Sequence, residues 1–179
     1  MLLLTIYQLR SPTGPGVWWM AETTMRYCID DGLHQQTINL PPNLDERRKR
    51  IFWTAYMLRG SVARTMGRTY SVSDRDIDVS LPSNIDDELD TDETIVAAIA
   101  ELNQNPLQIT ALTPAIHIFG LQQIDSKTSH TVCGVDKDIS AIKPRKVARL
   151  REALEEWKAG ILRLAPRTSR ILTLQRTTT

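Results

Sequence analysis

The sequence predicts an all-α fold, an irregular bundle of about five to seven helices joined by long loops. Apolar residues recur three or four positions apart from Leu44 to Met66 and again from Lys146 to Leu164, which is the spacing of one helix face. Clusters of proline and glycine, such as residues 11–16, separate stretches of this kind. Gly67 to Ile85 alternates in part, but its scattered aspartates and Pro82 favour an extended loop over a strand.

Three helices are expected in the first part of the chain. A short apolar helix covers Leu2 to Leu9, and a second helix covers Val17 to Asp31, ending on Gly32, which adopts a left-handed cap without strain. After a loop from Thr37 to Asn43, the strongest helix runs from Leu44 to Met66 and closes at Gly67. Its predicted apolar stripe comprises Ile51, Phe52, Ala55, Tyr56, Val62, Ala63 and Met66.

The second part of the chain is also expected to be helical. Asp90 and Glu93 form a capping box for a helix that stops at Asn105–Pro106. A further helix is expected from Leu107 to Ile124, kinked or divided by Pro114 inside it, and Ser126 to Pro144 is expected to be a connector.

The last helix is expected from Lys146 to Leu164. Its stripe has the spacing of a coiled-coil seam but lasts fewer than three heptads, which favours core packing over self-association. The length of 179 residues corresponds to about one domain. We therefore expect residues 1–165 to form one domain and residues 166–179 to be a mobile tail.

Composition excludes several classes of protein. The net charge of +1 argues against a protein that coats nucleic acid through bulk charge, and two cysteines rule out a disulfide framework or a zinc module built on four or six cysteines of this chain. No apolar run approaches the ~18–20 residues of a membrane span, and the N-terminus lacks the features of a secretory signal. A soluble intracellular protein without membrane contact is the expectation.

Charge is segregated along the chain. Leu44 to Arg68 holds seven basic and two acidic residues, whereas Asp74 to Glu93 holds nine acidic residues and one arginine. The basic residues 47–50 stand near the start of a helix, where the dipole disfavours cations, although such a cluster could also serve as a nuclear import signal or a phosphate patch. We expect the basic and acidic blocks to pack against each other.

No catalytic or metal template fits the sequence. Asp74, Asp76 and Asp78 match the first half of a calcium loop, but Val79 and Ile85 occupy the positions of its glycine and glutamate. The aspartates are therefore expected to act as local caps and acceptors. Only His130 and Cys133 lie close together among the soft metal ligands, and no nucleophile motif or phosphate loop occurs. The sequence predicts no enzyme, no catalytic residue, no metal site and no cofactor site.

One stretch resembles a known family. Residues 46–56, Glu-Arg-Arg-Lys-Arg-Ile-Phe-Trp-Thr-Ala-Tyr, followed by residues 66–82 with Gly67-Arg68 and Asp-Arg-Asp-Ile-Asp-Val-Ser-Leu-Pro, are similar to the hallmark of the fungal-specific transcription factor domain. This domain is the middle homology region of fungal binuclear zinc-cluster regulators. Trp18, residues 26–34, residues 119–126 and the helix around Trp157 also look like parts of it, so that the resemblance covers about nine-tenths of the chain.

The resemblance implies an all-α regulatory domain in the nucleus that modulates transcription by RNA polymerase II through other regulators, the transcription machinery or a small-molecule effector. In this family, DNA is read by an N-terminal domain that holds two zinc ions on six cysteines, and that domain is not encoded in these 179 residues. The alternatives are a small-molecule sensor, with a pocket lined by Trp18, Trp19, Trp53, Tyr56 and Met57, and a non-functional truncated copy.

Departures from the family pattern favour a truncated or decaying copy. Arg59-Gly60 stands where the family has Asp-Arg, Thr69 where it has Pro, and Asp31 where it has Leu. The leucine-rich start of the chain is typical of the middle of a core helix and supports the same interpretation.

The motif residues are expected to be scaffold and not a ligand site. Trp53 and Tyr56 share a helix face and can pack while their polar tips stay hydrogen-bonded. Arg68 is expected to reach the loop aspartates, and Leu81-Pro82 to fix the exit of the loop. The structural motif residues are Arg47, Arg48, Phe52, Trp53, Tyr56, Gly67, Arg68, Asp74, Asp76, Asp78, Leu81 and Pro82.

Overall fold

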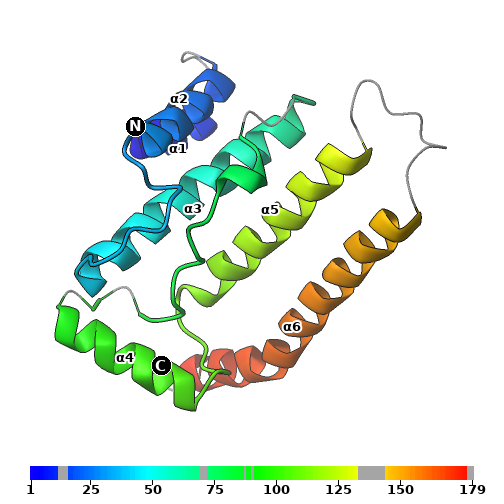
Figure 1. The fold of residues 1–179 in the computed structure, drawn as a ribbon. Coiled ribbons are helices and arrows are strands. Elements are labelled where there is room, and N and C mark those ends of the chain that lie inside the picture. Colours follow the sequence, from blue (N-terminus) through cyan, green and yellow to red (C-terminus); the bar gives the residue numbers. More distant parts are fainter. Residues whose placement is uncertain (12–15, 69–71, 87, 90, 133–143, 177–179) are drawn as a thin grey trace. The chain divides into compact units, whose positions relative to one another are not determined.

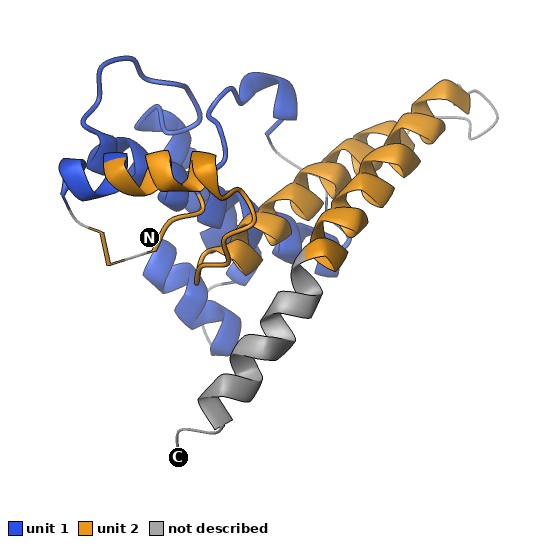
Figure 2. Cartoon of the chain, turned by 90° about the horizontal axis from the view of Figure 1, so that it is seen from below, with its two compact units in different colours: residues 1–83, 90–96 blue, residues 84–89, 97–179 orange. Residues whose placement is uncertain are grey.

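A computed structural model describes the chain except residues 12–15, 69–71, 87, 90, 133–143 and 177–179, and except the side chains that follow Arg163. The described residues form six α-helices and one short 3₁₀ helix, without a strand, so that the all-α prediction is confirmed (Figure 1). They divide into two compact units, coloured separately in Figure 2. Unit 1 comprises Met1–Ser83 and Asp90–Val96, and unit 2 comprises Asn84–Leu89 and Ala97–Thr179.

Unit 1 begins with the helices α1 (Leu2–Arg10) and α2 (Val17–Asp30), which pack against each other. Their contact is partly polar: the hydroxyls of Thr5 and Thr24 lie 2.8 Å apart, and Thr24 donates to the carbonyl of Met20. Both threonines are buried, whereas the leucines on the other side of α1 are exposed. Thr5 is therefore the polar side chain through which α1 contacts α2.

The helix α3 (Pro42–Thr65) packs on α2 and provides much of the core of unit 1. Phe52, Trp53 and Tyr56 are at most 1% exposed, and their rings form edge-to-face pairs at 5.4 Å for Phe52–Trp53 and 5.2 Å for Trp53–Tyr56. Ile51 and Met66 are almost half exposed, so that these two residues were wrongly predicted to belong to the buried stripe of the helix.

The start of α3 differs from the sequence expectation. We expected Asn43 to belong to a loop, but the helix begins at Pro42. Proline fits the first helical position because its fixed φ is helical and the missing N–H would have no partner there. The first-turn N–H of Asn43 is satisfied by the carboxylate of Asp92, at 2.8 Å.

Two glycines end α2 and α3 in the same way. Gly32 and Gly67 have φ of +65° and +63°, the left-handed conformation that L side chains adopt at a cost. The next residue in each case bonds back into the helix, Leu33 to the carbonyl of Cys28 and Arg68 to that of Ala63, both at 2.8 Å. These are Schellman caps, and both predicted helix ends are confirmed.

The segment after α3 is irregular, as expected, apart from the 3₁₀ helix η1 (Asp74–Asp76). The next helix, α4 (Asp92–Gln104), begins in unit 1 and ends in unit 2. Thr91 caps it by accepting the N–H of Thr94. The proposed cap Asp90 lies outside the described residues.

Unit 2 is built on α5 (Thr113–Val132) and α6 (Pro144–Arg176), which run side by side (Figure 1). The expectation of a helix over residues 107–124 was wrong at both ends. Pro114 stands in the first turn of α5, where proline is tolerated, and therefore begins the helix without kinking it. Ser126, which we expected to begin a connector, lies inside α5 and is fully buried.

The helix α6 also extends past the expected end at Leu164, through Pro166, to Arg176. Its Trp157 donates its indole N–H to the carbonyl of His117 on α5, at 2.8 Å. A Cβ atom on Gly120 of α5 would lie 3.7 Å from Cδ1 of Trp157, and one on Gly160 of α6 would lie 3.6 Å from Cε1 of His117, which is ordinary van der Waals contact. Trp157 of the α6 stripe therefore packs on α5, whereas Val147 and Leu154 of the same stripe are 49% and 41% exposed, so that the core-packing interpretation holds only for part of the stripe.

Candidate functional site

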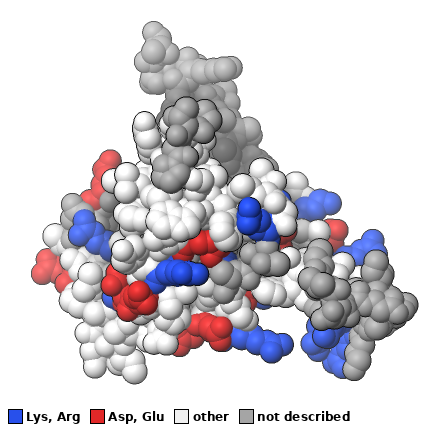
Figure 3. Space-filling view, turned by 90° about the horizontal axis from the view of Figure 1, so that it is seen from above, with Lys and Arg blue, Asp and Glu red and all other residues white. Residues whose placement is uncertain are grey.

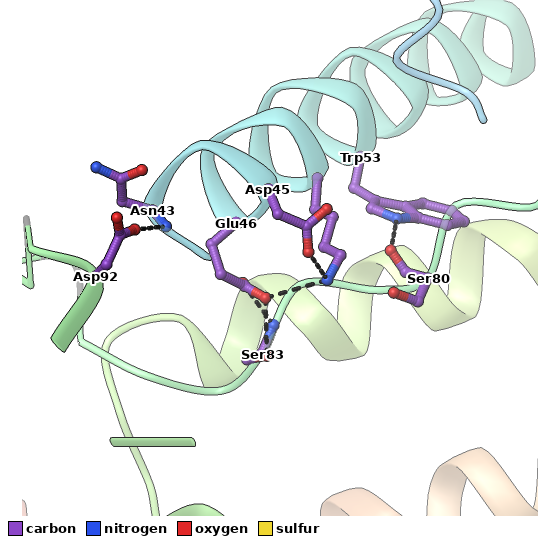
Figure 4. Close-up of polar contacts among 8 residues, drawn as sticks. Asn43, Asp45, Glu46, Trp53, Ser80, Ser83 and Asp92 are labelled. Atoms are coloured by element: carbon purple, nitrogen blue, oxygen red, sulfur yellow. Dashed lines mark hydrogen bonds and ion pairs between the residues drawn. The ribbon is translucent and has the colours of Figure 1, made fainter. Parts of the chain in front are cut away.

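The family-like motif folds into one connected group of side chains on α3 and on the segment 72–83 that follows it. We call this group the motif cluster; Figure 4 shows the part of it nearest the start of α3. Glu46, Lys49, Trp53 and Tyr56 are spaced three or four residues apart and so share one face of α3. The cluster comprises these four residues and Asp45, Asp74, Ser80 and Ser83.

Glu46 holds the end of the segment. It is 3% exposed, and its two carboxylate oxygens accept the backbone N–H of Ser83 at 2.9 Å and the Ser83 hydroxyl at 2.8 Å (Figure 4). A buried carboxylate needs such partners, because an unpaired one costs several kcal/mol. The segment is therefore tied to α3 through both backbone and side chain of one serine.

Lys49 supplies the positive charge of the cluster. Its ammonium lies 2.6 Å from Asp45 and 3.3 Å from Glu46, one turn earlier on the same helix. Burial acts to lower the pKa of Lys49, but the Asp45 and Glu46 carboxylates outweigh it and raise the pKa. The ammonium is thus kept charged beside the buried carboxylate of Glu46.

Trp53 and Tyr56 hold the middle of the segment, as their spacing predicted. The Trp53 indole donates to the carbonyl of Ser80 at 2.8 Å, and the Tyr56 hydroxyl donates to Asp74 at 2.6 Å. Between these contacts and Ser83 lies Leu81–Pro82, with Pro82 buried and Leu81 half-buried. The expectation that large aromatic side chains pack while their polar tips stay bonded is confirmed.

Two of the three aspartates of the loop act as acceptors. Asp74 accepts from Tyr56, and Asp78 accepts the backbone N–H of Gln36 at 2.7 Å, so that their donors lie in distant parts of the chain and not in the loop itself. Asp76 is exposed on η1. No group of three or more metal-ligating side chains occurs among the described residues.

The neighbouring basic residues Arg47 and Arg48 play different parts. Arg48 donates to the carbonyls of Asp31 at 3.4 Å and Gly32 at 3.1 Å, at the negative end of α2. Arg47 is exposed. Since Arg48 and Lys49 are engaged in the fold, the basic run is not a free patch.

The expected packing of the basic block, residues 44–68, against the acidic block, residues 74–93, is confirmed by the contacts of Tyr56 with Asp74 and of Glu46 with Ser83. Arg48 and Lys49 do not make this contact, because their partners lie at the end of α2 and within α3. The acidic block does reach the start of α3, but Asp92 contacts a backbone N–H there and not an arginine. Figure 3 shows acidic and basic side chains interspersed on the face drawn.

Arg68 was also placed wrongly. Its guanidinium lies 4.5 Å above the Trp18 ring on α2, a cation–π contact, and not on the loop aspartates. The Schellman cap at Gly67 turns the chain back after α3 and so carries Arg68 toward α2. Thr69, the departure from the family pattern next to it, lies outside the described residues.

Arg59, the other main departure, is 1% exposed, and its guanidinium lies 5.4 Å from the centre of the Tyr56 ring. The replacement therefore puts a cation inside the core of unit 1, where an aromatic face stabilises it.

Sequence reasoning missed five members of the cluster, which are Asp45, Glu46, Lys49, Ser80 and Ser83. A signal for Glu46 was present, because it precedes Lys49 and Trp53 at helical spacing and so had to share their face. No comparable signal marks Ser80, whose contribution is a backbone carbonyl.

The aromatic set proposed for a ligand pocket does not act as one group. Trp53 and Tyr56 are core residues, whereas Trp19 is 58% exposed. The buried thiol of Cys28 is not activated either: burial, and next the charge of Asp31, raise its pKa to about 11. None of the described helices is long and apolar enough to span a bilayer.

The arrangement defines a structural motif within an all-α fold. The chain belongs to the family described as the fungal specific transcription factor domain, whose sequence model matches residues 1–159. This match covers all of unit 1 and unit 2 up to residue 159.

The relatives are regulators by name. The chain is 36% identical over 90 residues to pyrimidine pathway regulatory protein 1 of Saccharomyces cerevisiae, covering 48% of this chain and 10% of that protein. It is 29% identical over 109 residues to the negative regulator of pleiotropic drug resistance STB5 of Candida glabrata, covering 58% and 11%. It is 27% identical over 129 residues to the positive regulator of purine utilization of Emericella nidulans, covering 55% and 12%.

The chain thus spans about a tenth of the length of these relatives. No solved structure matches it.

Proposed function

We propose that this chain is the regulatory part of a zinc-cluster type transcription regulator and modulates transcription by RNA polymerase II in the nucleus through protein contacts. The observation that carries the proposal is the family match over residues 1–159. The motif cluster supports it, because the residues most typical of the family form a buried scaffold. A scaffold of this kind fixes the surface that a protein partner would meet.

DNA recognition is assigned to a separate module. The chain contains two cysteines, fewer than the six on which the family's zinc cluster is built, and its net charge is +1. We therefore propose that the chain itself takes no metal or cofactor and contributes no catalytic step. The partner surfaces belong to other regulators or to the transcription machinery.

A tethering assay tests the proposal. The chain is fused to an unrelated DNA-binding domain in yeast, and a reporter with the matching sites is measured. We expect reporter output to change severalfold, in either direction, relative to the DNA-binding domain alone. Trp53→Ala, which removes a core side chain, should abolish the change, whereas the exposed Arg47→Ala should preserve it. An unchanged reporter, with the intact fusion present in the nucleus, would contradict the proposal.

A further inference from the structure

We propose that Ser83 is a phosphorylation site for a serine kinase that recognises acidic sequences, and that its phosphate releases the segment 80–83 from α3. The sequence that follows, Ser-Asn-Ile-Asp-Asp-Glu over residues 83–88, places acidic residues three, four and five positions after the serine. Kinases select substrates by such charge patterns. Asp86 and Glu88 are exposed, and no helix or strand covers residues 81–86.

Ser83 also occupies a sensitive position. It is the last residue of its stretch of unit 1, and the chain enters unit 2 at Asn84. It is half-buried, and its hydroxyl donates to the nearly fully buried Glu46 at 2.8 Å. A modification of this hydroxyl therefore acts directly on the contact that ties the segment to α3.

The reaction is an ordinary phosphoryl transfer from ATP. The Ser83 oxygen forms a bond to the γ-phosphorus, the bond between that phosphorus and the β-phosphate oxygen breaks, and ADP leaves. The hydroxyl proton passes to the catalytic carboxylate of the kinase. ATP and the kinase are the co-reactants, and no redox change occurs.

The product cannot keep the native contact. The ester oxygen has no proton to donate to Glu46, and the phosphate brings a charge of about −1.5 to −2 at pH 7. The site already contains the carboxylates of Asp45 and Glu46 against one ammonium, that of Lys49. Repulsion and loss of the donor therefore both favour departure of the segment. Trp53 then loses its acceptor, the Ser80 carbonyl.

Ser73 offers an internal comparison. It also has acidic residues after it, Asp74 at one position and Asp76 at three. Its side-chain oxygen, however, accepts from the N–H of Arg75 in its own loop, at 3.3 Å, whereas the Glu46 carboxylate accepts from Ser83. A phosphate on Ser73 should leave the contact between Ser83 and Glu46 intact. Both serines precede acidic residues, but only Ser83 contacts Glu46, so that a comparison of the two tests whether the structural effect depends on this contact.

The first experiment maps the site. The folded chain is incubated with an acidophilic serine kinase and ATP–Mg²⁺, and phosphates are located by mass spectrometry. We expect a phosphate on Ser83 that is absent in Ser83→Ala and formed at least tenfold more slowly in the double variant Asp86→Asn, Glu88→Gln. These two residues are exposed, so that the fold is retained. A wild-type chain without phosphate on Ser83, or an equal rate in the double variant, would overturn the proposal.

The second experiment measures the consequence by hydrogen exchange. We expect the Ser83 amide, which donates to Glu46, to lose protection at least tenfold on phosphorylation of Ser83 in a Ser73→Ala background. In the Ser83→Ala variant, exchange at the amide of residue 83 should be the same with and without a phosphate on Ser73. Unchanged protection of the Ser83 amide in the chain phosphorylated on Ser83 would overturn the release. Neither readout depends on the regulatory role proposed above.

Discussion

At the scale of single residues, Glu46 does most to connect the motif. Its carboxylate joins the first turns of α3 to a serine 37 positions later and also neighbours Lys49. The aromatic residues further along the helix could pack in several ways. A buried charge is satisfied by only a few arrangements of partners, so that the contact of Glu46 with Ser83 fixes where the segment 72–83 lies on α3.

We expect Glu46→Gln to lower the free energy of unfolding by about 1–3 kcal/mol. The amide keeps one acceptor oxygen but turns a donor toward Ser83, which itself offers two donors. It also removes one of the two carboxylates beside Lys49 and leaves that of Asp45. Urea unfolding followed by circular dichroism measures the change. Glu101→Gln, on the exposed surface of α4, is the matched control and should stay within about 0.5 kcal/mol of the wild type. Equal stability of the two variants would show that the Glu46 contacts contribute nothing net.

Cys28 gives a second prediction at this scale. Its pKa of about 11, against an ordinary 9.0, lowers the thiolate fraction at pH 8 about 100-fold, and its side chain is 4% exposed. In a Cys133→Ser background, which leaves Cys28 as the sole thiol, we expect Ellman's reagent to react at least 100-fold more slowly with the folded chain than with the chain in guanidinium. Comparable rates would mean that α2 opens readily.

The same thiol couples stability to pH. Because the folded pKa lies above the unfolded one, the contribution of Cys28 is fully present below pH 9 and is lost as the pH rises toward 11. Between pH 9 and pH 11, the urea concentration at the midpoint of unfolding should fall more steeply for the Cys133→Ser variant than for the double variant Cys28→Ala, Cys133→Ser. Parallel curves would contradict the assignment.

At the scale of elements, helix ends organise unit 1. Gly32 and Gly67 terminate α2 and α3 with the same hydrogen-bond pattern, and Arg48 adds a positive group to the end of α2. Arg48 comes from the next helix in the sequence, so that it ties α3 to the end of α2.

We expect Arg48→Ala to destabilise the chain by about 1 kcal/mol, through loss of two hydrogen bonds to carbonyls that carry the negative end of the α2 dipole. Arg47→Ala removes the same charge one residue away, from an exposed side chain, and should change stability by less than about 0.5 kcal/mol. Thermal unfolding of both variants at low and high salt measures the difference. If the two variants lose the same stability, net charge and not the Arg48 contact is responsible.

The elements also show what the sequence could and could not predict. Helix periodicity located α2 and α3, and glycine located their ends, because both signals are local. Pro114 led to the wrong expectation of a kinked or divided helix. Proline breaks a helix in its interior but is accepted in its first turn, and the periodicity did not show which turn of α5 Pro114 occupies. Within the site, Trp53 and Tyr56 were found from spacing, whereas Arg68 was misplaced because its direction depends on how the chain turns after Gly67.

At the scale of the whole molecule, the described residues form two compact units, and the family's sequence model covers all of unit 1 and unit 2 up to residue 159. The chain enters unit 2 at Asn84, whose side chain donates to the carbonyl of Gln108 and accepts from Thr110 and Thr113. Ser83 and Asn84, adjacent in sequence, are thus each fixed within their own unit. The expected division into residues 1–165 and a mobile tail stays a prediction.

The charge of the whole chain leads to a prediction about DNA. Affinity for duplex DNA comes largely from contacts of Lys and Arg with phosphates, and it falls steeply with salt when many contacts form. Here 22 basic residues are balanced by 21 acidic ones, and Arg48 and Lys49 are already engaged within unit 1. We therefore expect the chain alone to bind duplex DNA more weakly than about 10⁻⁶ M at physiological salt, without sequence preference.

Fluorescence anisotropy with a labelled duplex pool, at 50 mM and 200 mM salt, measures this affinity. A fusion of the chain to a six-cysteine zinc-cluster domain is the positive control and should bind its own site tightly in the same buffers, with binding lost when zinc is chelated. The chain without the fusion should give the same weak signal with and without the chelator, since it has two cysteines. A sequence-specific complex of the chain alone that persists at 200 mM salt would show that these helices read DNA themselves, and DNA recognition would then have to be assigned to the regulatory domain.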